Sequence, residues 1–403
     1  MRCWTTCTSE RVYSSGDIGD GTERPRVTLH IAFNAQRLAG QRLGVGRYIE
    51  YHLRYWQEML AAEERVTVFL RRPLSAGAAA YLRLPTSMPV QVLPPDVSGI
   101  LWENLSLRWP ATRHDVLFCP AYTAPIGYRG RLVVATHSVN NIHPGAHGWS
   151  YRFTHASLNR HSATRADAVI AASESARDVI ADVWRIPEAR ISVVLQGADD
   201  CFVPTTDAST RAAVRTRFFG RDRPYVLFAG KASTRRNIPM LLRAFAQVRR
   251  ELRIPHGLLL FGPNPDGLPL QRYCEELGIS GDVVQTDGIV DDHSELVPVY
   301  GSADLFVHPS EFEGWSMTTV EAMSCGVAVI ATNRGGLGEL ARGHALTLDA
   351  PSVDSLADAI ARVLGDEALR LELQQKALAR GSTLRWRATT RQTLDVLRRV
   401  AAH

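Results

Sequence analysis

Lysine is nearly absent from this chain. Of its 46 lysines and arginines, only Lys231 and Lys376 are lysines, so any chemistry that requires a lysine amine has just these two candidates. Cysteine is also scarce, and its positions form no Cys-x-x-Cys pair and no Cys/His cluster with the spacing of metal ligands. This pattern is typical of scattered reduced thiols in a cytosolic protein. The six cysteines lie at positions 3, 7, 119, 201, 274 and 325.

Long apolar runs and long runs of one charge are missing as well. No stretch approaches the ~18 apolar residues that a membrane-spanning helix needs, so we expect any membrane contact to be peripheral, at the inner face of the plasma membrane. The formal net charge is +5, and residues 1–200 hold 22 basic against 18 acidic residues, a tilt compatible with an anionic bilayer. No basic, aromatic-rich segment predicts nucleic-acid binding. Residues 1–25 lack the apolar core of a signal peptide and are expected to form a disordered tail.

Short apolar runs alternate with helical patterns along the rest of the chain, which predicts parallel sheets with helices on both faces. We therefore expect an α/β fold of two Rossmann-like, doubly wound domains that face an interdomain cleft, where ligands bind. Periodicity weakens between Asp199 and Arg223, which predicts domains at 26–199 and 200–384. Helices are predicted at 50–60, 353–364 and 367–379, with a last helix around Trp386. Strands are predicted at 27–33, 65–70, 90–93, 116–119, 132–136, 168–171, 192–195, 225–229, 257–261, 283–286, 305–308 and 328–332.

The most specific feature is the segment 310–330, which reads S-E-F-E-G-W-S-M-T-T-V-E-A-M-S-C-G-V-A-V-I. A predicted strand, a turn at Gly314 and a helix follow one another here. This order directs the free backbone N–H groups near Ser316 and Thr318 into the cleft, where they can hold an anion. Glu313 precedes the turn, and Glu321 lies about two helical turns deeper. One carboxylate can therefore face the sugar side of a ligand while the other accepts two adjacent hydroxyls.

Two glutamates with seven residues between them, followed by Ala-Met and Gly-Val-x-Val-Ile, resemble the signature of the retaining GT-B glycosyltransferases of family 4, also called glycosyltransferase group 1. The resemblance spans about residues 26–399. It implies an N-terminal acceptor domain completed by a returning C-terminal helix at 385–403, and a C-terminal donor domain. It also implies that Glu321 binds the donor ribose and Glu313 the sugar hydroxyls. Further donor contacts implied within the segment are Gly314, Trp315, Ser316, Met317 and Thr318.

A second element, at 225–238, reads Y-V-L-F-A-G-K-A-S-T-R-R-N-I and is predicted as a strand, a Gly turn and a helix beginning near Pro239. Its cations, Lys231 and Arg236, follow the end of the strand beside a helix N-terminus, where they can clamp a diphosphate. The family usually has Arg first and Lys second, so the two types are exchanged here. The resemblance implies that both stabilise the charge on the leaving diphosphate.

Two elements of the N-terminal half complete the predicted site. Gly44-Val45-Gly46 is not a dinucleotide fingerprint, but its bare amides can approach a phosphate, and by resemblance this loop faces the donor diphosphate. His137 ends the predicted strand 132–136, where the family typically has His-Asp and this chain has Ser138. The resemblance implies that His137 contacts the donor sugar. Gly262 and Val290 stand where the nucleotide base of the family packs.

The resemblance implies an enzyme that moves a hexose, from GDP-mannose or a UDP-hexose, to a hydroxyl of a glycan or lipid-linked acceptor with retention. The branch it most resembles contains mannosyltransferases of bacterial surface polysaccharide and glycoconjugate synthesis. The chain has no Asp-x-Asp sequence that would suggest a divalent metal holding the diphosphate. We therefore expect no metal and no other cofactor, and we expect fixed cationic side chains to hold the diphosphate.

Three alternatives use the same fold. A phosphorylase needs a lysine for pyridoxal phosphate, and Lys231 lies in the phosphate clamp and Lys376 on a polar helix, which nearly excludes it. A nucleotide-sugar epimerase would turn over the donor alone. A catalytically degenerate partner subunit would explain the departures at Ser138, Gln196 and Ser316 and the exchange of the two cation types. Against it, both glutamates, both positive charges, the Gly loop and the histidine are retained.

Overall fold

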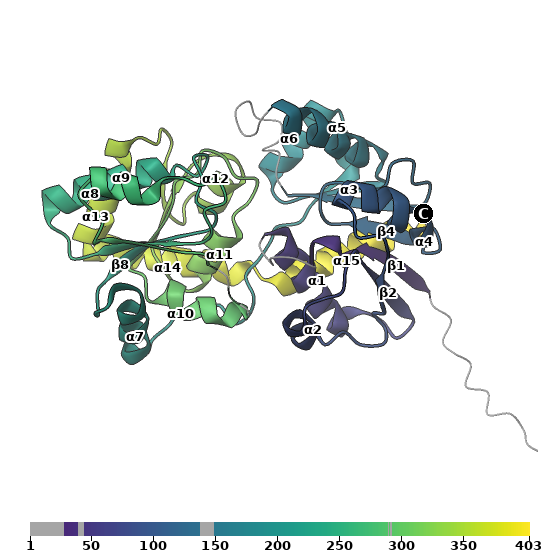
Figure 1. Cartoon of the computed structure of the whole chain (residues 1–403), viewed down its shortest axis with the longest axis horizontal. Coiled ribbons are helices and arrows are strands. Elements are labelled where there is room, and N and C mark those ends of the chain that lie inside the picture. The colour runs from purple at the N-terminus through teal and green to yellow at the C-terminus, as the bar shows by residue number, and fades with distance from the viewer. Residues whose placement is uncertain (1–27, 39–43, 138–148, 289, 291) are drawn as a thin grey trace, which may run out of the picture.

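Two parallel β-sheets form the frame of the protein. The computed structural model describes residues 28–38, 44–137, 149–288, 290 and 292–403, so the predicted tail at 1–25 and the position of Ser138 lie outside it. Within these residues the first sheet has seven strands, in the order β3-β2-β1-β4-β5-β6-β7, and the second has six, in the order β10-β9-β8-β11-β12-β13. Figure 1 shows the two sheets in separate bodies that lie side by side, each with helices on both faces. The predicted pair of Rossmann-like domains is thus confirmed.

The first body contains every predicted strand of the N-terminal half, with small shifts at the ends. Its strands are β1 (Leu29–Asn34), β2 (Glu64–Leu70), β3 (Val90–Val92), β4 (Val116–Cys119), β5 (Leu132–Thr136), β6 (Ala168–Ala171) and β7 (Ile191–Val193). Its helices are η1 (Gln36–Leu38), α1 (Val45–Met59), α2 (Ala76–Leu82), α3 (Gly99–Trp102), the π-helical η2 (Glu103–Leu107), α4 (Arg108–Ala111), α5 (Trp149–Arg165), α6 (Glu174–Trp184) and η3 (Glu188–Arg190). The helix predicted at 50–60 begins earlier, at Val45, inside the Gly-rich segment.

The second body contains the remaining predicted strands and one more, β13, which the sequence did not predict. Its strands are β8 (Tyr225–Ala229), β9 (Gly257–Phe261), β10 (Val283–Thr286), β11 (Leu305–His308), β12 (Val329–Thr332) and β13 (Leu346–Leu348). Its helices are α7 (Ala208–Phe219), α8 (Ile238–Leu252), α9 (Leu270–Glu276), η4 (His293–Glu295), α10 (Leu296–Gly301), α11 (Met317–Ser324), α12 (Gly335–Ala341), α13 (Val353–Gly365) and α14 (Glu367–Thr383).

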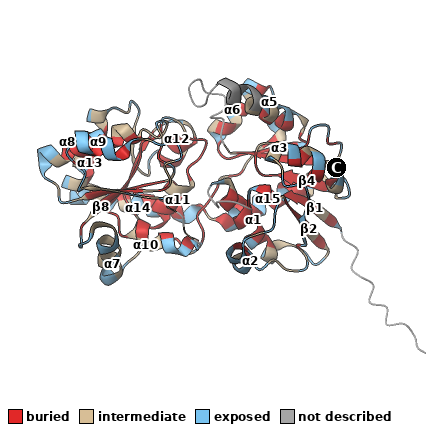
Figure 2. Ribbon diagram, in the orientation of Figure 1, coloured by how far each residue is buried: buried red, intermediate tan, exposed pale blue. Residues whose placement is uncertain are grey.

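The central strands are buried on both faces, as a parallel sheet covered by helices requires. Every residue of β4, β5, β8 and β11 is buried, and Figure 2 shows the buried residues concentrated along the strands of both bodies. The apolar runs that predicted these strands are therefore the residues that the helices cover.

The chain passes between the two bodies twice. Val194 belongs to a core cluster of the first sheet and Ala198 to a cluster of the second. Near the C-terminus, Leu384 packs in the second body, whereas Trp386 opens α15 (Trp386–Ala402) and packs in the first. Figure 1 shows α15 returning across the first body. The domain limits 26–199, 200–384 and 385–403 stay predictions.

None of the helices in the described ranges is both long and apolar enough to cross a bilayer.

Candidate active site

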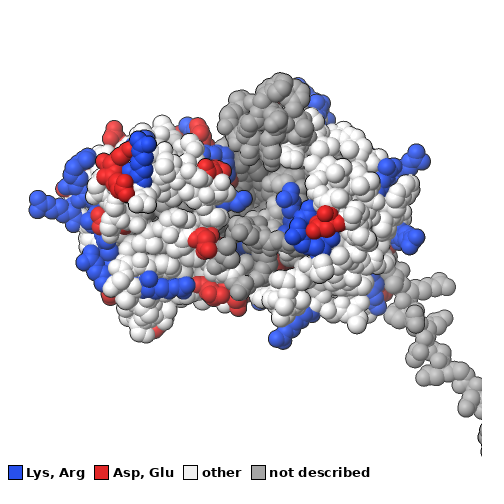
Figure 3. All heavy atoms as spheres, viewed as in Figure 1, with Lys and Arg blue, Asp and Glu red and all other residues white. Residues whose placement is uncertain are grey.

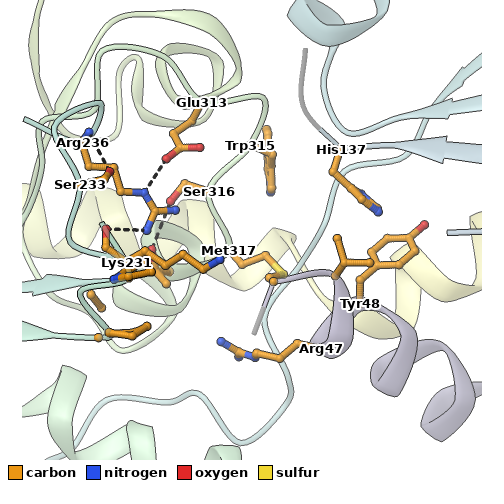
Figure 4. Close-up of a pocket in the computed structure, with 18 of the residues that line it drawn as sticks. Arg47, Tyr48, His137, Lys231, Ser233, Arg236, Glu313, Trp315, Ser316 and Met317 are labelled. Carbon is orange, nitrogen blue, oxygen red and sulfur yellow. Dashed lines mark hydrogen bonds and ion pairs between the residues drawn. The ribbon is translucent and has the colours of Figure 1, made fainter. Parts of the chain in front are cut away.

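A cavity of about 690 Å³ lies between the two bodies, at the carboxyl ends of strands from both sheets. Most of the predicted site residues line it, and Figure 4 shows side chains from the two bodies facing each other across it. The predicted residues among its lining are Gly44, Val45, His137, Lys231, Arg236, Gly262, Glu313, Trp315, Ser316, Met317 and Thr318. Gly46, Gly314 and Glu321 do not line this cavity, and Val290 lines a smaller hollow beside Phe261.

Arg236 and Glu313 form a charged centre on the side of the cavity that the second body contributes. Arg236 Nε donates to Glu313 Oε1 at 3.0 Å, and Arg235 Nη1 lies 3.2 Å from the same oxygen. Burial acts to raise the pKa of Glu313, but the adjacent guanidinium of Arg236, with help from His308 and Arg235, lowers it well below its usual range. Glu313 is therefore a carboxylate throughout the neutral range and holds Arg236 in place.

The Arg236 guanidinium lies against bare backbone at the end of β8. A Cβ on Gly230 would meet Arg236 Nη1 at 2.3 Å, and Gly230 has φ +132°. Arg236 Nη1 also donates to the carbonyl oxygen of Lys231 at 3.3 Å. The positive φ therefore favours glycine after the strand, and any side chain there would have to displace the Arg236 guanidinium.

Two helix N-termini face the cavity from opposite bodies. Helix α11 begins at Met317 with Ser316 as its N-cap, whose hydroxyl accepts from Thr319 N–H at 3.3 Å. Helix α1 begins at Val45 with Gly44 as its N-cap, at φ 49°, and Gly44 has no side-chain cap. Because the first-turn N–H groups of a helix lack intrahelical partners, both ends can donate to an anion in the cavity.

His137 faces the cavity as a neutral ring held by two neighbours. Its Nε2 lies 2.6 Å from the carbonyl oxygen of Pro120, which can only accept, so Nε2 carries the proton. Its Nδ1 lies 2.9 Å from Gln196 Nε2 and accepts from that amide. Burial lowers the pKa of His137 to about 4, although the bond to Pro120 opposes this shift. At neutral pH, His137 contributes shape and a polar ring edge, not a positive charge.

The lowered pKa of His137 predicts a loss of stability in mild acid. Its folded pKa of about 4 lies below the ordinary histidine pKa of 6.5, so the unfolded chain binds the proton more readily between these two values. The stabilising effect of the neutral ring is complete above about pH 6.5 and falls as the pH drops toward 4. Urea unfolding from about pH 7 to about pH 4.5 should show a smaller decline for His137→Gln than for wild type, because glutamine can donate to Pro120 without titrating. Parallel curves would contradict this assignment.

Glu321, predicted to bind the donor ribose, is occupied in this structure by protein groups. Its Oε1 accepts from Arg47 Nη2 of the other body, and its Oε2 accepts from the Tyr300 hydroxyl at 2.7 Å. Glu321 is 0% exposed, whereas Arg47 and Tyr300 both line the cavity. A ligand in the cavity would therefore contact these two side chains before it reached Glu321.

The sequence reasoning did not assign several polar residues that line the cavity. Arg47 and Tyr48 directly follow the Gly loop, and Ser233 and Arg235 lie within the predicted element 225–238, so local signals for these four were available. The other residues belong to no predicted motif, because loops distant in the sequence bring them together. The unassigned lining residues include Arg37, Arg47, Tyr48, Tyr122, Thr123, His155, Asn159, Ser233, Arg235, Asp266 and Tyr300.

Positive charge dominates the described lining of the cavity. Two carboxylates, Asp266 and Glu313, line it, against five cations: Arg37, Arg47, Lys231, Arg235 and Arg236. Such an excess favours an anionic ligand and strengthens its binding where water is partly excluded. Among the described residues, no group of three His, Cys, Asp or Glu side chains is arranged to hold a metal ion.

Two family models match the chain. Residues 43–202 match the model "Glycosyltransferase Family 4", and residues 213–380 match "Glycosyl transferases group 1". Similar curated proteins include O-antigen chain mannosyltransferase B of Escherichia coli, 27% identical, and a GDP-mannose-dependent alpha-(1-6)-phosphatidylinositol monomannoside mannosyltransferase of Mycolicibacterium smegmatis, 32% identical. Each match covers 60% of this chain. The matched region covers 63% of the Escherichia coli protein and 65% of the Mycolicibacterium protein, so this chain spans slightly less than two thirds of the length of each relative.

Solved structures share the fold. Anabaena HepE in complex with UDP-glucose superposes with a TM-score of 0.74 at 20% identity, covering 92% of this chain and 99% of HepE. Sucrose-phosphate synthase from Thermosynechococcus elongatus superposes with a TM-score of 0.73 at 20% identity, covering 93% and 99%. These structures confirm the predicted fold, and both family models that match the chain are models of glycosyltransferases, the enzyme class that the sequence predicted. The chain belongs to the family 4 glycosyltransferases, with the GT-B fold.

Proposed function

We propose that this chain transfers a hexose from a nucleoside diphosphate sugar to a hydroxyl of a glycan or lipid-linked acceptor, with retention at the anomeric carbon. The observation that carries the proposal is the convergence of Arg236, Lys231 and the N-termini of α1 and α11 on one cavity between the bodies. This arrangement suits a diphosphate leaving group, because its donors are fixed before charge develops. The cations of the lining also support a reaction without a divalent metal.

The contacts of Glu313 agree with a front-face displacement, in which the acceptor attacks C1 on the face from which the diphosphate leaves. Glu313 already accepts from Arg236 and Ser310, and it lies beside Arg235, so it is engaged as an anchor and not poised as a nucleophile. In the proposed step the bond from C1 to the phosphate oxygen breaks, and the bond from C1 to the acceptor oxygen forms on the same face. The acceptor proton passes to the departing phosphate oxygen.

GDP-mannose is the donor that the relatives favour. Both relatives described above are named mannosyltransferases, and the Mycolicibacterium relative is named as GDP-mannose-dependent. HepE was solved with UDP-glucose, which supports a nucleotide sugar as the class of donor. We therefore propose a mannosyltransferase of bacterial glycoconjugate or surface polysaccharide synthesis, cytoplasmic and peripheral at the inner face of the plasma membrane.

A donor panel tests this proposal. Calorimetry with GDP-mannose, UDP-glucose and other UDP- and GDP-sugars should show binding of one nucleotide class, with GDP-mannose the expected ligand. With alkyl hexosides as acceptors, NMR of the product should show the anomeric configuration of the donor, and a chelator should leave the rate unchanged. Binding without transfer would indicate a degenerate partner subunit. Donor conversion without acceptor would indicate an epimerase, and an inverted product or chelator-sensitive activity would contradict the proposed chemistry.

A further inference from the structure

An exposed apolar face lies on the first body, outside the cavity. Helices α3, η2 and α4 follow one another without a break over residues 99–111. Leu101, Leu105 and Trp109 are four residues apart along this run, and they are 54%, 63% and 67% exposed. The π-helical turns of η2 widen the helix, so side chains four residues apart stay on one face. We call Leu101, Leu105, Trp109 and the neighbouring Ile126 the apolar face.

Packing and hydrogen bonds beneath the apolar face keep its side chains exposed to solvent. On the opposite side Trp102 is fully buried, and its Nε1 donates to the carbonyl oxygen of Leu93 at 2.7 Å. Asn104 Oδ1 accepts from the backbone N–H of Ile126 at 2.8 Å, which ties the following loop to the helix and leaves Ile126 45% exposed. The exposed leucines and the tryptophan therefore cannot turn inward without breaking the packing beneath them.

Arginines border the apolar face, and the nearest exposed carboxylates along the chain, Asp96 and Asp115, lie outside the helical run that carries it. The Arg108 guanidinium lies 5.2 Å from the Trp109 ring, and Arg113 and Arg129 are exposed. Within residues 99–113 and 125–130 the lone carboxylate, Glu103, is buried. In Figure 3 the surface over α3 is largely white, the colour of uncharged residues. Apolar side chains with an arginine fringe match the acyl boundary and the phosphates of an anionic bilayer.

The apolar face is continuous with the acceptor side of the cavity. Ile100 stands next to Leu101 in the same helical run and lines the cavity. Tyr122 and Thr123 line it from the loop that also carries Ile126. Arg37 lines the same side and adds positive charge. A membrane that covered the apolar face would therefore lie next to the entrance through which an acceptor reaches the cavity.

We propose that the apolar face docks the first body on an anionic lipid bilayer and so presents the cavity to a membrane-anchored acceptor. The docking itself is independent of the reaction, whereas the presentation of an acceptor rests on the proposed function. A narrow row of side chains on one helix fits a lipid surface better than a protein partner, because a stable protein interface buries about 800 Å² on each side. Tryptophan and arginine are also the side chains that settle best at the boundary between acyl chains and water.

Vesicle sedimentation with the full-length protein tests the docking. We expect wild type to bind vesicles of phosphatidylcholine with phosphatidylglycerol, and to bind phosphatidylcholine alone more weakly. The variant L105E/W109E should bind the anionic vesicles at least ~10-fold more weakly, because two carboxylates would enter the acyl boundary. The matched control is L252E/L371E, which adds the same charge at leucines 53% and 49% exposed on the second body, and it should bind like wild type.

A soluble-acceptor assay separates the docking from the reaction. L105E/W109E should transfer sugar to alkyl hexosides at the wild-type rate, because neither side chain lines the cavity. Vesicle binding without any transfer would contradict the proposed function and leave the docking standing. Transfer by a wild-type protein that stays in the supernatant would overturn the docking. Equal vesicle binding by L105E/W109E and the control would also overturn it, as would dimerisation through this face in place of vesicle binding.

Discussion

Replacement of Arg236 by methionine is expected to lower kcat/KM for the nucleotide sugar about 1,000-fold, or roughly 4 kcal/mol in transition-state stabilisation. Arg236 is held by Glu313 at 3.0 Å and by the Lys231 carbonyl at 3.3 Å, so its guanidinium is positioned before the donor arrives. Methionine keeps most of the chain length but removes every donor and the charge. The loss should fall on kcat as well as KM, because charge on the diphosphate grows as the sugar bond breaks.

Three further variants test whether this effect belongs to Arg236. Arg243→Met removes an exposed arginine from α8 of the same body and should leave kcat/KM unchanged. Lys231→Ala should cost less than Arg236→Met, because Lys231 is exposed in this structure and is not positioned by a salt bridge to Glu313. Lys231→Arg, which restores the residue type that the family usually has here, should stay near wild type. A folded Arg236→Met enzyme with near wild-type turnover would show that the clamp is assigned to the wrong residue.

The sequence predicted the central strands and the positions of the loops that follow β8 and β11 well, because their signals are local. Strand β8 is an unbroken apolar run and β5 is apolar up to its last residue, Thr136, and the observed bounds of both coincide with the predicted ones. Strand β13 was missed because it is three half-buried residues at the edge of its sheet, too short for a periodic pattern. The start of α1 at Val45 was also missed, since glycines normally weaken a helix and here one of them caps it.

Contacts between the bodies could not be predicted, because they depend on how two separately folded units meet. Arg47 and Glu321 are 274 positions apart, and no local pattern connects them. The same is true of Trp315, whose indole N–H donates to the Gln196 carbonyl at 2.8 Å. Glu321 stays a predicted ligand for hydroxyls, and nothing in its local sequence indicated that the buried Arg47 donates to one of its oxygens.

Loss of Arg47 is expected to destabilise the folded protein strongly. Glu321 is fully buried, and Arg47 supplies its positive partner, so Arg47→Met would leave a buried carboxylate with the Tyr300 hydroxyl alone. Removing one partner of a buried ion pair typically costs about 3–5 kcal/mol. The double variant Arg47→Met/Glu321→Gln should recover much of this loss, because no unpaired charge remains. Urea unfolding of the two single variants and the double variant measures the interaction free energy between Arg47 and Glu321. If the two single losses simply add in the double variant, the predicted ion-pair coupling is wrong.

Nucleotide binding to the Glu321→Gln variant tests whether Glu321 binds the donor ribose. If it does, the ribose hydroxyls must reach a carboxylate whose two oxygens already accept from Arg47 and Tyr300. Nucleotides that lack the 2′ and 3′ hydroxyls should then bind wild type more weakly than their ribose parents, by a factor that disappears in Glu321→Gln. If both proteins lose affinity equally, Glu321 serves only to join the bodies. In that case Arg47 and Tyr300, which line the cavity, are the groups that face the nucleotide.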